Sequence, residues 1–253
     1  YAQEYSKGKP TTKVRKTGNC KKRGTTVIFE PDPEIFKEIR FDIKKILNHL
    51  RQQAYLTSGV KITVYDQRTS PNFVYNFYFE GGLETYVKYL INRAEPRHDN
   101  IFYVKGEKEG IIVESAFQYA QEMEVLEQSF ANNICTEEGG SHLTGFRTAL
   151  TRVLNDYARK NNYLKEKDEN FAGNDVREGL IAVVSVKLKD PQFEGQTKAR
   201  LGNPEAKSAV EQVLSEGLSD FLERNPQDAQ GKSENDLLSA KARRAARAAR
   251  NTV

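Results

Sequence analysis

The sequence contains no tryptophan, a single methionine, two cysteines and three histidines among its 253 residues. Cys20 and Cys135 are too few for a disulfide framework or a cysteine-based metal site, and the histidines do not stand at a spacing typical of metal ligands. No apolar run is long enough to cross a bilayer, and the polar, basic start shows no signal peptide. We therefore expect a cytoplasmic protein with no metal site of its own and no membrane contact.

Two kinds of catalytic pattern are also missing. There is no glycine-rich phosphate loop of the strand–GxxxxGK[ST]–helix type, and no nucleophile stands beside a base. We expect no catalytic residue in this chain, and no activity of the chain in isolation. The length and the hydrophobic content of 38% suffice for one large domain or two smaller ones. Because the sequence begins at Tyr1 rather than at methionine, we interpret it as part of a longer protein.

Charge is unevenly distributed along the chain. The net charge is +4, yet residues 1–25 carry +7 and residues 241–250 carry +5, which leaves −8 for the rest. Basic segments can neutralise the phosphates of nucleic acids, but they are equally typical of plain solvated surface. One hypothesis is therefore a free-standing basic module that binds nucleic acid through its two ends.

Apolar periodicity predicts an α+β fold. Alternating or continuous apolar runs predict strands at residues 24–29, 60–64, 74–79, 101–104, 111–119, 125–131 and 180–188. Apolar residues at helical spacing predict helices over residues 43–54, 83–91, 143–157 and 204–221. The run Leu180–Leu188 is almost entirely apolar, which is typical of a strand buried on both faces.

A polar loop containing Gln196, Thr197 and Lys198 follows this strand. A lone lysine on a loop is most often ordinary solvated surface. The surrounding sequence is more specific than the loop itself. Three separated motifs stand out, and they are Phe130–Ile134 (FANNI), Gly139–Arg147 (GGSHLTGFR) and the block Asp175–Lys198.

Together these motifs resemble the B subunit of bacterial type II topoisomerases, the family of DNA gyrase and topoisomerase IV. The resemblance covers nearly the whole chain, and the gyrase and topoisomerase IV proteins share every motif quoted, so it does not separate them. It implies the end of a GHKL-type ATPase domain at residues 1–80 and a ribosomal-protein-like β-α transducer domain at residues 81–225. A connecting helix towards the cleavage domain would occupy residues 226–253.

The resemblance also implies roles for particular residues. Gln196 and Lys198 would reach the terminal phosphate of ATP, and a compact ammonium on a flexible stem suits that task. Thr25 and Val27, within the motif Gly24–Val27, would border the adenine pocket. An ordinary β-branched strand is the alternative interpretation of that short motif.

Arg147 and Arg152 lie on the predicted helix after the glycine pair. The resemblance implies that they look into a cavity through which a DNA segment passes, where phosphate contact without base recognition is sufficient. Helical geometry places them roughly 140° apart, so they do not share one face. The alternative is a solvent-facing helix whose arginines pair weakly with acidic neighbours.

The implied cofactors are ATP and Mg²⁺, with the metal ligands and the catalytic residues outside this sequence. The implied partners are the topoisomerase A subunit, DNA and a second copy of the B subunit. The chain would then relay the nucleotide state of an ATP-hydrolysing enzyme to DNA strand passage.

Overall fold

A computed structural model describes residues 1–19, 21, 23–92, 94–121 and 124–233. The chain divides into two compact units, residues 1–46 and 47–253, and each is described by itself. Within the described ranges, no helix is long and apolar enough to cross a membrane. The predicted domain limits at residues 80 and 225 remain predictions.

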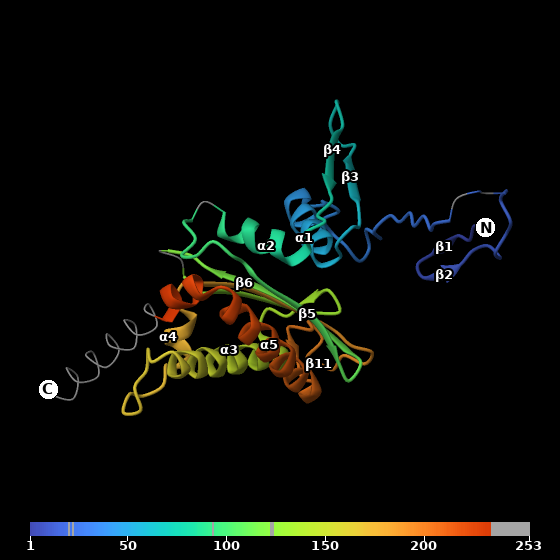
Figure 1. Ribbon diagram of the computed structural model, residues 1–253. Coiled ribbons are helices and arrows are strands. Elements are labelled where there is room, and N and C mark those ends of the chain that lie inside the picture. Colours follow the sequence, from blue (N-terminus) through green and yellow to red (C-terminus); the bar gives the residue numbers. More distant parts are fainter. Residues whose placement is uncertain (20, 22, 93, 122–123, 234–253) are drawn as a thin grey trace, which may run out of the picture. The chain divides into compact units, whose positions relative to one another are not determined.

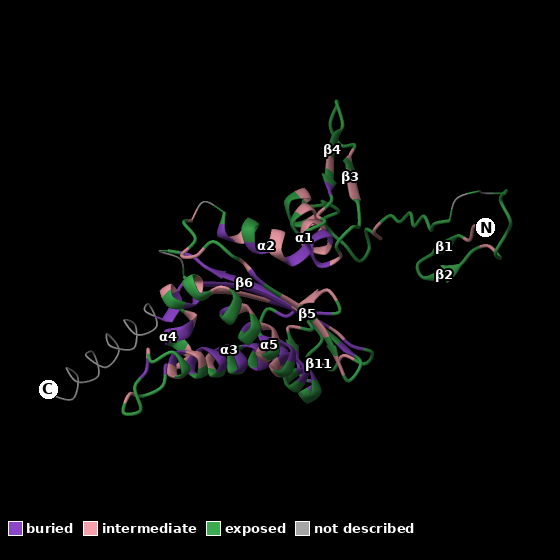
Figure 2. Ribbon diagram, viewed as in Figure 1, coloured by how far each residue is buried: buried purple, intermediate pink, exposed green. Residues whose placement is uncertain are grey.

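The first unit has little regular structure and no buried residue among those described (Figure 2). Strands β1 (Tyr5–Ser6) and β2 (Lys9–Pro10) form a short antiparallel hairpin. The strand predicted at residues 24–29 is wrong, because this segment has no regular structure and Val27 is 79% exposed. A strand requires a neighbour for its backbone hydrogen bonds, and no described residue pairs with this segment.

The second unit is built on a five-stranded sheet with the strand order β5-β6-β10-β7-β8. Two of its strands, β5 and β6, are labelled in Figure 1. Strand β10 is antiparallel to β6 and parallel to β7. The bounds are β5 Phe102–Lys108, β6 Ile111–Tyr119, β7 Leu126–Ala131, β8 Ile134–Cys135 and β10 Leu180–Lys187.

Helices cover both faces of this sheet (Figure 1). Helices α3 (Ser141–Lys160) and α5 (Pro204–Arg224) cover one face, and α2 (Gly82–Ile91) covers the other together with the end of α1 (Ile43–Leu56). Because side chains alternate along a strand, Val184 of β10 packs towards α3 and α5 while Val183 packs towards α2. The predicted burial of this strand on both faces is confirmed.

Smaller elements complete the second unit. Strands β3 (Ile62–Asp66) and β4 (Phe73–Phe77) form a hairpin, and α4 (Gly173–Arg177) leads into β10. A three-stranded sheet has the order β11-β12-β9, with bounds β9 Gly139–Gly140, β11 Phe193–Glu194 and β12 Arg200–Leu201. Residues 226–233 are helical, while residues 234–253 of the predicted connecting helix lie outside the described residues.

Candidate functional site

Gln196 and Lys198 lie at the exposed tip of the hairpin that β11 and β12 form. The turn needs two left-handed backbone positions, Gly195 at φ +73° and Lys198 at φ +58°. Glycine adopts this conformation freely, whereas a lysine pays a cost of about 1–2 kcal/mol there. Lys198 therefore stands in a backbone conformation that glycine or asparagine adopts at lower cost.

The charge of Lys198 is not neutralised by a nearby acid. Its Nζ lies 5.7 Å from the centre of the Phe193 ring, a cation–π contact. Among the described residues, neither Gln196 nor Lys198 makes a side-chain hydrogen bond or an ion pair. Both donors therefore remain available to an anionic ligand.

The base of the hairpin is held in the core, in contrast to its tip. Leu201 of β12 is 1% exposed and belongs to the cluster under α3 and α5. Strand β12 pairs in parallel with the glycine pair of β9, and the Glu138 N–H donates to the Ala199 carbonyl at 2.9 Å. Gly140 has no room for a Cβ, because that atom would collide with the backbone of Leu201. The glycine motif and the Gln-Thr-Lys loop, about 55 residues apart in sequence, are thus neighbours.

Asn203 closes the segment that carries the loop. Its side chain accepts a hydrogen bond from the Gln192 N–H at 2.6 Å and donates to the Asp190 carbonyl at 3.1 Å. The Gly202 N–H adds a bond to the Gln192 carbonyl at 2.7 Å. Asn203 is 1% exposed, so these bonds are shielded from water. The sequence analysis missed this residue, although an asparagine directly before Pro204 is a recognisable turn and helix-start signal.

A second group that the sequence analysis missed is a buried polar cluster of Ser129, Thr136 and His142. The Thr136 hydroxyl donates to the Ser129 carbonyl at 2.9 Å, and the Ser129 hydroxyl donates to the Thr136 carbonyl at 3.1 Å. The two hydroxyl oxygens lie 2.7 Å apart, and the Thr136 Oγ1 lies within hydrogen-bond distance of His142 Nε2, at 3.2 Å. Nothing in the periodicity of the sequence indicates this cluster, because its members come from a strand, a turn and a helix start.

Two asparagines of the FANNI motif connect the sheet to its surroundings. Asn132 pairs with the backbone of Leu188 in both directions, at 2.8 and 2.9 Å, which fixes where the chain leaves β10. Asn133 donates to the Thr57 Oγ1 at 3.0 Å and accepts from Gln53 Nε2 on α1 at its carbonyl, also at 3.0 Å. Helix α1 is therefore tied to the turn between β7 and β8.

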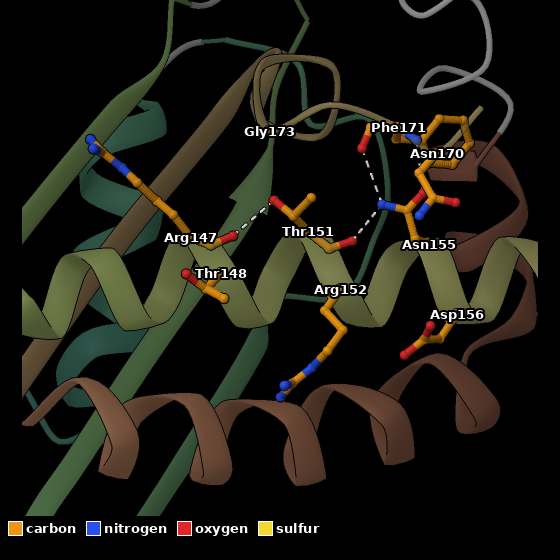
Figure 3. A pocket seen from close by; sticks show the side chains of 9 residues that line it. All are labelled: Arg147, Thr148, Thr151, Arg152, Asn155, Asp156, Asn170, Phe171 and Gly173. Carbon is orange, nitrogen blue, oxygen red and sulfur yellow. Dashed lines mark hydrogen bonds between the residues drawn. The ribbon is translucent and has the colours of Figure 1, made fainter. Parts of the chain in front are cut away.

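Arg147 and Arg152 line one surface cleft of about 500 Å³ along α3 (Figure 3). They leave the helix in different directions, as the helical geometry predicts. Arg147 Nε lies 3.1 Å from each carboxylate oxygen of Glu127, whose side chain is 6% exposed, while Arg152 Nη2 donates to the Ser215 Oγ at 2.8 Å. Arg147 is therefore paired with a buried acid, while Arg152 keeps its charge free of an acid within the described residues.

Thr25 and Val27 lie in the first unit and Gln196 and Lys198 in the second. No group of three or more potential metal ligands occurs in the part of the chain that the structure describes.

The basic N-terminal segment is partly neutralised within the first unit. Lys7 pairs with Glu34 at 2.7 Å, and Arg15 pairs with Glu4 at the same distance. These pairs lower the charge available to a nucleic acid. The second basic stretch, residues 241–250, lies outside the described residues.

A family model described as DNA gyrase B matches residues 82–252. This range covers more than half of the sequence and contains all three motifs. The chain belongs to the DNA gyrase B family. Among curated relatives, the DNA gyrase B protein of Clostridium acetobutylicum is 46% identical over 251 residues, which are 99% of this chain and 39% of that protein. The chain thus spans about two fifths of that relative's length.

Solved structures agree with the family. A crystal structure of the 43K ATPase domain of Thermus thermophilus gyrase B, in complex with an aminocoumarin, matches with a TM-score of 0.82 and 41% identity. That match covers 99% of this chain and 68% of the other. The topoisomerase IV ATP binding domain of Francisella tularensis, with a small-molecule inhibitor, matches with a TM-score of 0.71 and 26% identity over 84% and 57%. The mixed helix and sheet fold is therefore that of gyrase B.

Burial of His142 makes the stability of the gyrase B fold depend on pH. The side chain is fully buried, and desolvation lowers the pKa of His142 to about 4. In the unfolded chain the pKa of a histidine is about 6.5. Between these two pKa values the unfolded chain therefore binds a proton at His142 that the folded chain does not bind. The contribution of neutral His142 to the free energy of unfolding is complete above a pH of about 6.5. It decreases by about 3 kcal/mol in all as the pH falls towards 4.

The measurement is the free energy of unfolding by urea between pH 4 and 7.5, for the natural sequence and for His142→Gln. We expect the natural sequence to lose more stability on acidification than the variant. The other histidines are common to both proteins, so they cancel in the comparison. Parallel curves for the two proteins would contradict the assignment.

Proposed function

We propose that this chain is the nucleotide-sensing relay of the B subunit of an ATP-dependent type II DNA topoisomerase. In this proposal Gln196 and Lys198 contact the terminal phosphate of ATP. The observation that carries it is the hairpin itself, whose tip presents an uncompensated lysine while its base is held in the core. Membership in the gyrase B family supports the same assignment.

A contact made only to the terminal phosphate distinguishes ATP from ADP. A hydrogen bond to a charged group contributes about 1.5–3 kcal/mol, which corresponds to roughly one to two decades in an equilibrium constant. Loss of this phosphate on hydrolysis and product release removes the contact. The loop can then favour one arrangement of domains with ATP and another without it.

The route away from the loop runs through the core. Strand β12 pairs with β9, and β9 leads directly into α3. Gly145 of α3 lies so close to α5 that an added Cβ would meet the Lys207 carbonyl at 2.5 Å. Because α3 and α5 are in close contact, a displacement of the hairpin base would move both helices together rather than one.

The remaining ligands and partners follow from the family. Thr25 and Val27 would border the adenine ring, and ATP would be bound with Mg²⁺. The described residues offer no cluster for the metal, so its ligands would come from elsewhere in the full-length protein. The partners proposed are the gyrase A subunit, DNA and a second copy of the B subunit.

The test is Lys198→Ala in the full-length protein assembled with the A subunit. We expect ATP hydrolysis and ATP-driven change of DNA supercoiling to fall by roughly 10-fold or more, since the variant loses a charged phosphate contact. Circular dichroism and the melting temperature should stay close to those of the natural protein, because the side chain is exposed.

Lys189→Ala provides the matched control. Lys189 is an exposed lysine shortly before β11, and its loss should leave both activities unchanged. If Lys198→Ala also leaves both unchanged, the loop is ordinary surface and the basic-module hypothesis regains weight.

Arg152 is the stronger candidate for contact with passing DNA, because the Arg147 side chain is held by Glu127, an acid that Arg147 shares with Arg177, whereas no described acid pairs with Arg152. Arg152→Gln removes the charge and keeps a donor for the Ser215 hydroxyl. We expect the slope of log affinity for DNA against log salt to become shallower by about one, whatever the DNA sequence. The control is Arg224→Gln, which removes an exposed arginine paired with Asp220. An identical slope for the natural protein and both variants would exclude Arg152 from the DNA path.

A further inference from the structure

Behind the Gln-Thr-Lys loop lies the polar cluster of Ser129, Thr136 and His142, which has no contact with solvent. The three residues are 2%, 2% and 0% exposed. Burial of polar groups costs free energy, and apolar side chains of similar shape would fill the same space without that cost. In this cluster the two hydroxyls and His142 Nε2 are hydrogen-bonded, while His142 Nδ1 is buried without a partner among the described residues. A cluster of this kind is therefore informative about what its hydrogen bonds hold in place.

The bonds hold the turn that precedes the glycine pair. The Thr136 N–H donates to the Ser129 carbonyl at 2.8 Å, alongside the two side-chain bonds between the same residues. The Gly139 N–H then donates to the Thr136 carbonyl at 2.8 Å. The turn is thus fixed to β7 at one end and to the start of α3 at the other, through His142.

The same turn supports the loop. Between Thr136 and Gly139, the Glu138 N–H donates to the carbonyl of Ala199, the residue directly after Lys198. The next two residues of the turn, Gly139 and Gly140, pair with Arg200 and Leu201. A continuous set of hydrogen bonds therefore leads from Ser129 to the backbone beside Lys198.

We infer that Thr136 and His142 are positioning residues that fix the position and orientation of the Gln-Thr-Lys loop. This inference rests on the proposed role of Lys198 and names the residues that make that role possible. Thr136 fixes the turn to β7, and the hydrogen bond between His142 Nε2 and the Thr136 oxygen connects the turn to the start of α3. Both side chains are buried, so they act through the loop and not by contact with a ligand.

The inference predicts a selective loss of affinity. Thr136→Val keeps the shape of the side chain and removes its hydroxyl, so the turn loses one of its attachments to β7 and the loop is held less firmly. The full-length protein with the A subunit should bind a non-hydrolysable β,γ-imido analogue of ATP about 3- to 10-fold more weakly. Its affinity for ADP should not change, because ADP lacks the phosphate that Lys198 contacts.

Conservative variants separate positioning from general damage to the core. Thr136→Ser retains the hydroxyl and should restore affinity for the analogue. His142→Gln can place its amide nitrogen near the natural Nε2 and should be closer to the natural protein than His142→Leu. Thermal melting of each variant sets the temperature at which all of them are folded during the binding measurement.

Removing both phosphate contacts of the loop gives the decisive comparison. If Thr136 acts through Gln196 and Lys198, adding Thr136→Val to a variant that carries Gln196→Ala and Lys198→Ala should weaken analogue binding no further. Additive losses, an equal loss for ADP and for the analogue, or unchanged binding by folded Thr136→Val would each overturn the inference. If Lys198→Ala alone leaves analogue binding unchanged, the proposed function fails and the inference fails with it, so the two failures are distinguishable.

Discussion

Burial of β10 on both of its faces is the constraint on which the second unit depends. Every residue from Leu180 to Val186 is buried, so the strand can exist only between two helical layers. One layer is α3 with α5, and the other is α2 with the end of α1. The strand also decides where the loop lies, because Asn132 fixes the point at which the chain leaves β10 and Asn203 closes the segment that follows.

The hairpin combines a fixed base with an exposed tip. Leu201 and the β9 pairing hold the base in the core, while Lys198 extends into solvent in a left-handed conformation. The proposed sensing role requires both properties, since a ligand would have to reach the tip and a change there would have to move the core. The cluster around Thr136 gives the base its second attachment, to β7, which is the neighbour of β10.

Much of this fold can be predicted from the sequence, where local patterns decide it. The apolar run at β10 and the helical spacing in α3 and α5 predict these elements almost to their ends. The strand predicted at residues 24–29 is absent, because strand formation depends on a partner that local propensity does not reveal. The pair between Arg147 and Glu127 joins residues 20 positions apart, and no spacing rule predicts it. For Gln196 and Lys198 only the family resemblance singles out the loop, and the structure adds the reason that its tip is available.

The central claim is that Lys198 lies against the terminal phosphate, and the most direct measurement is chemical labelling by the nucleotide itself. An ATP analogue carrying an amine-reactive group on its terminal phosphate would be bound to the full-length protein, which would then be digested and mapped by mass spectrometry. We expect Lys198 to be the main labelled lysine and excess ATP to suppress its labelling. Labelling of other lysines, such as Lys189, with Lys198 unmodified would contradict it.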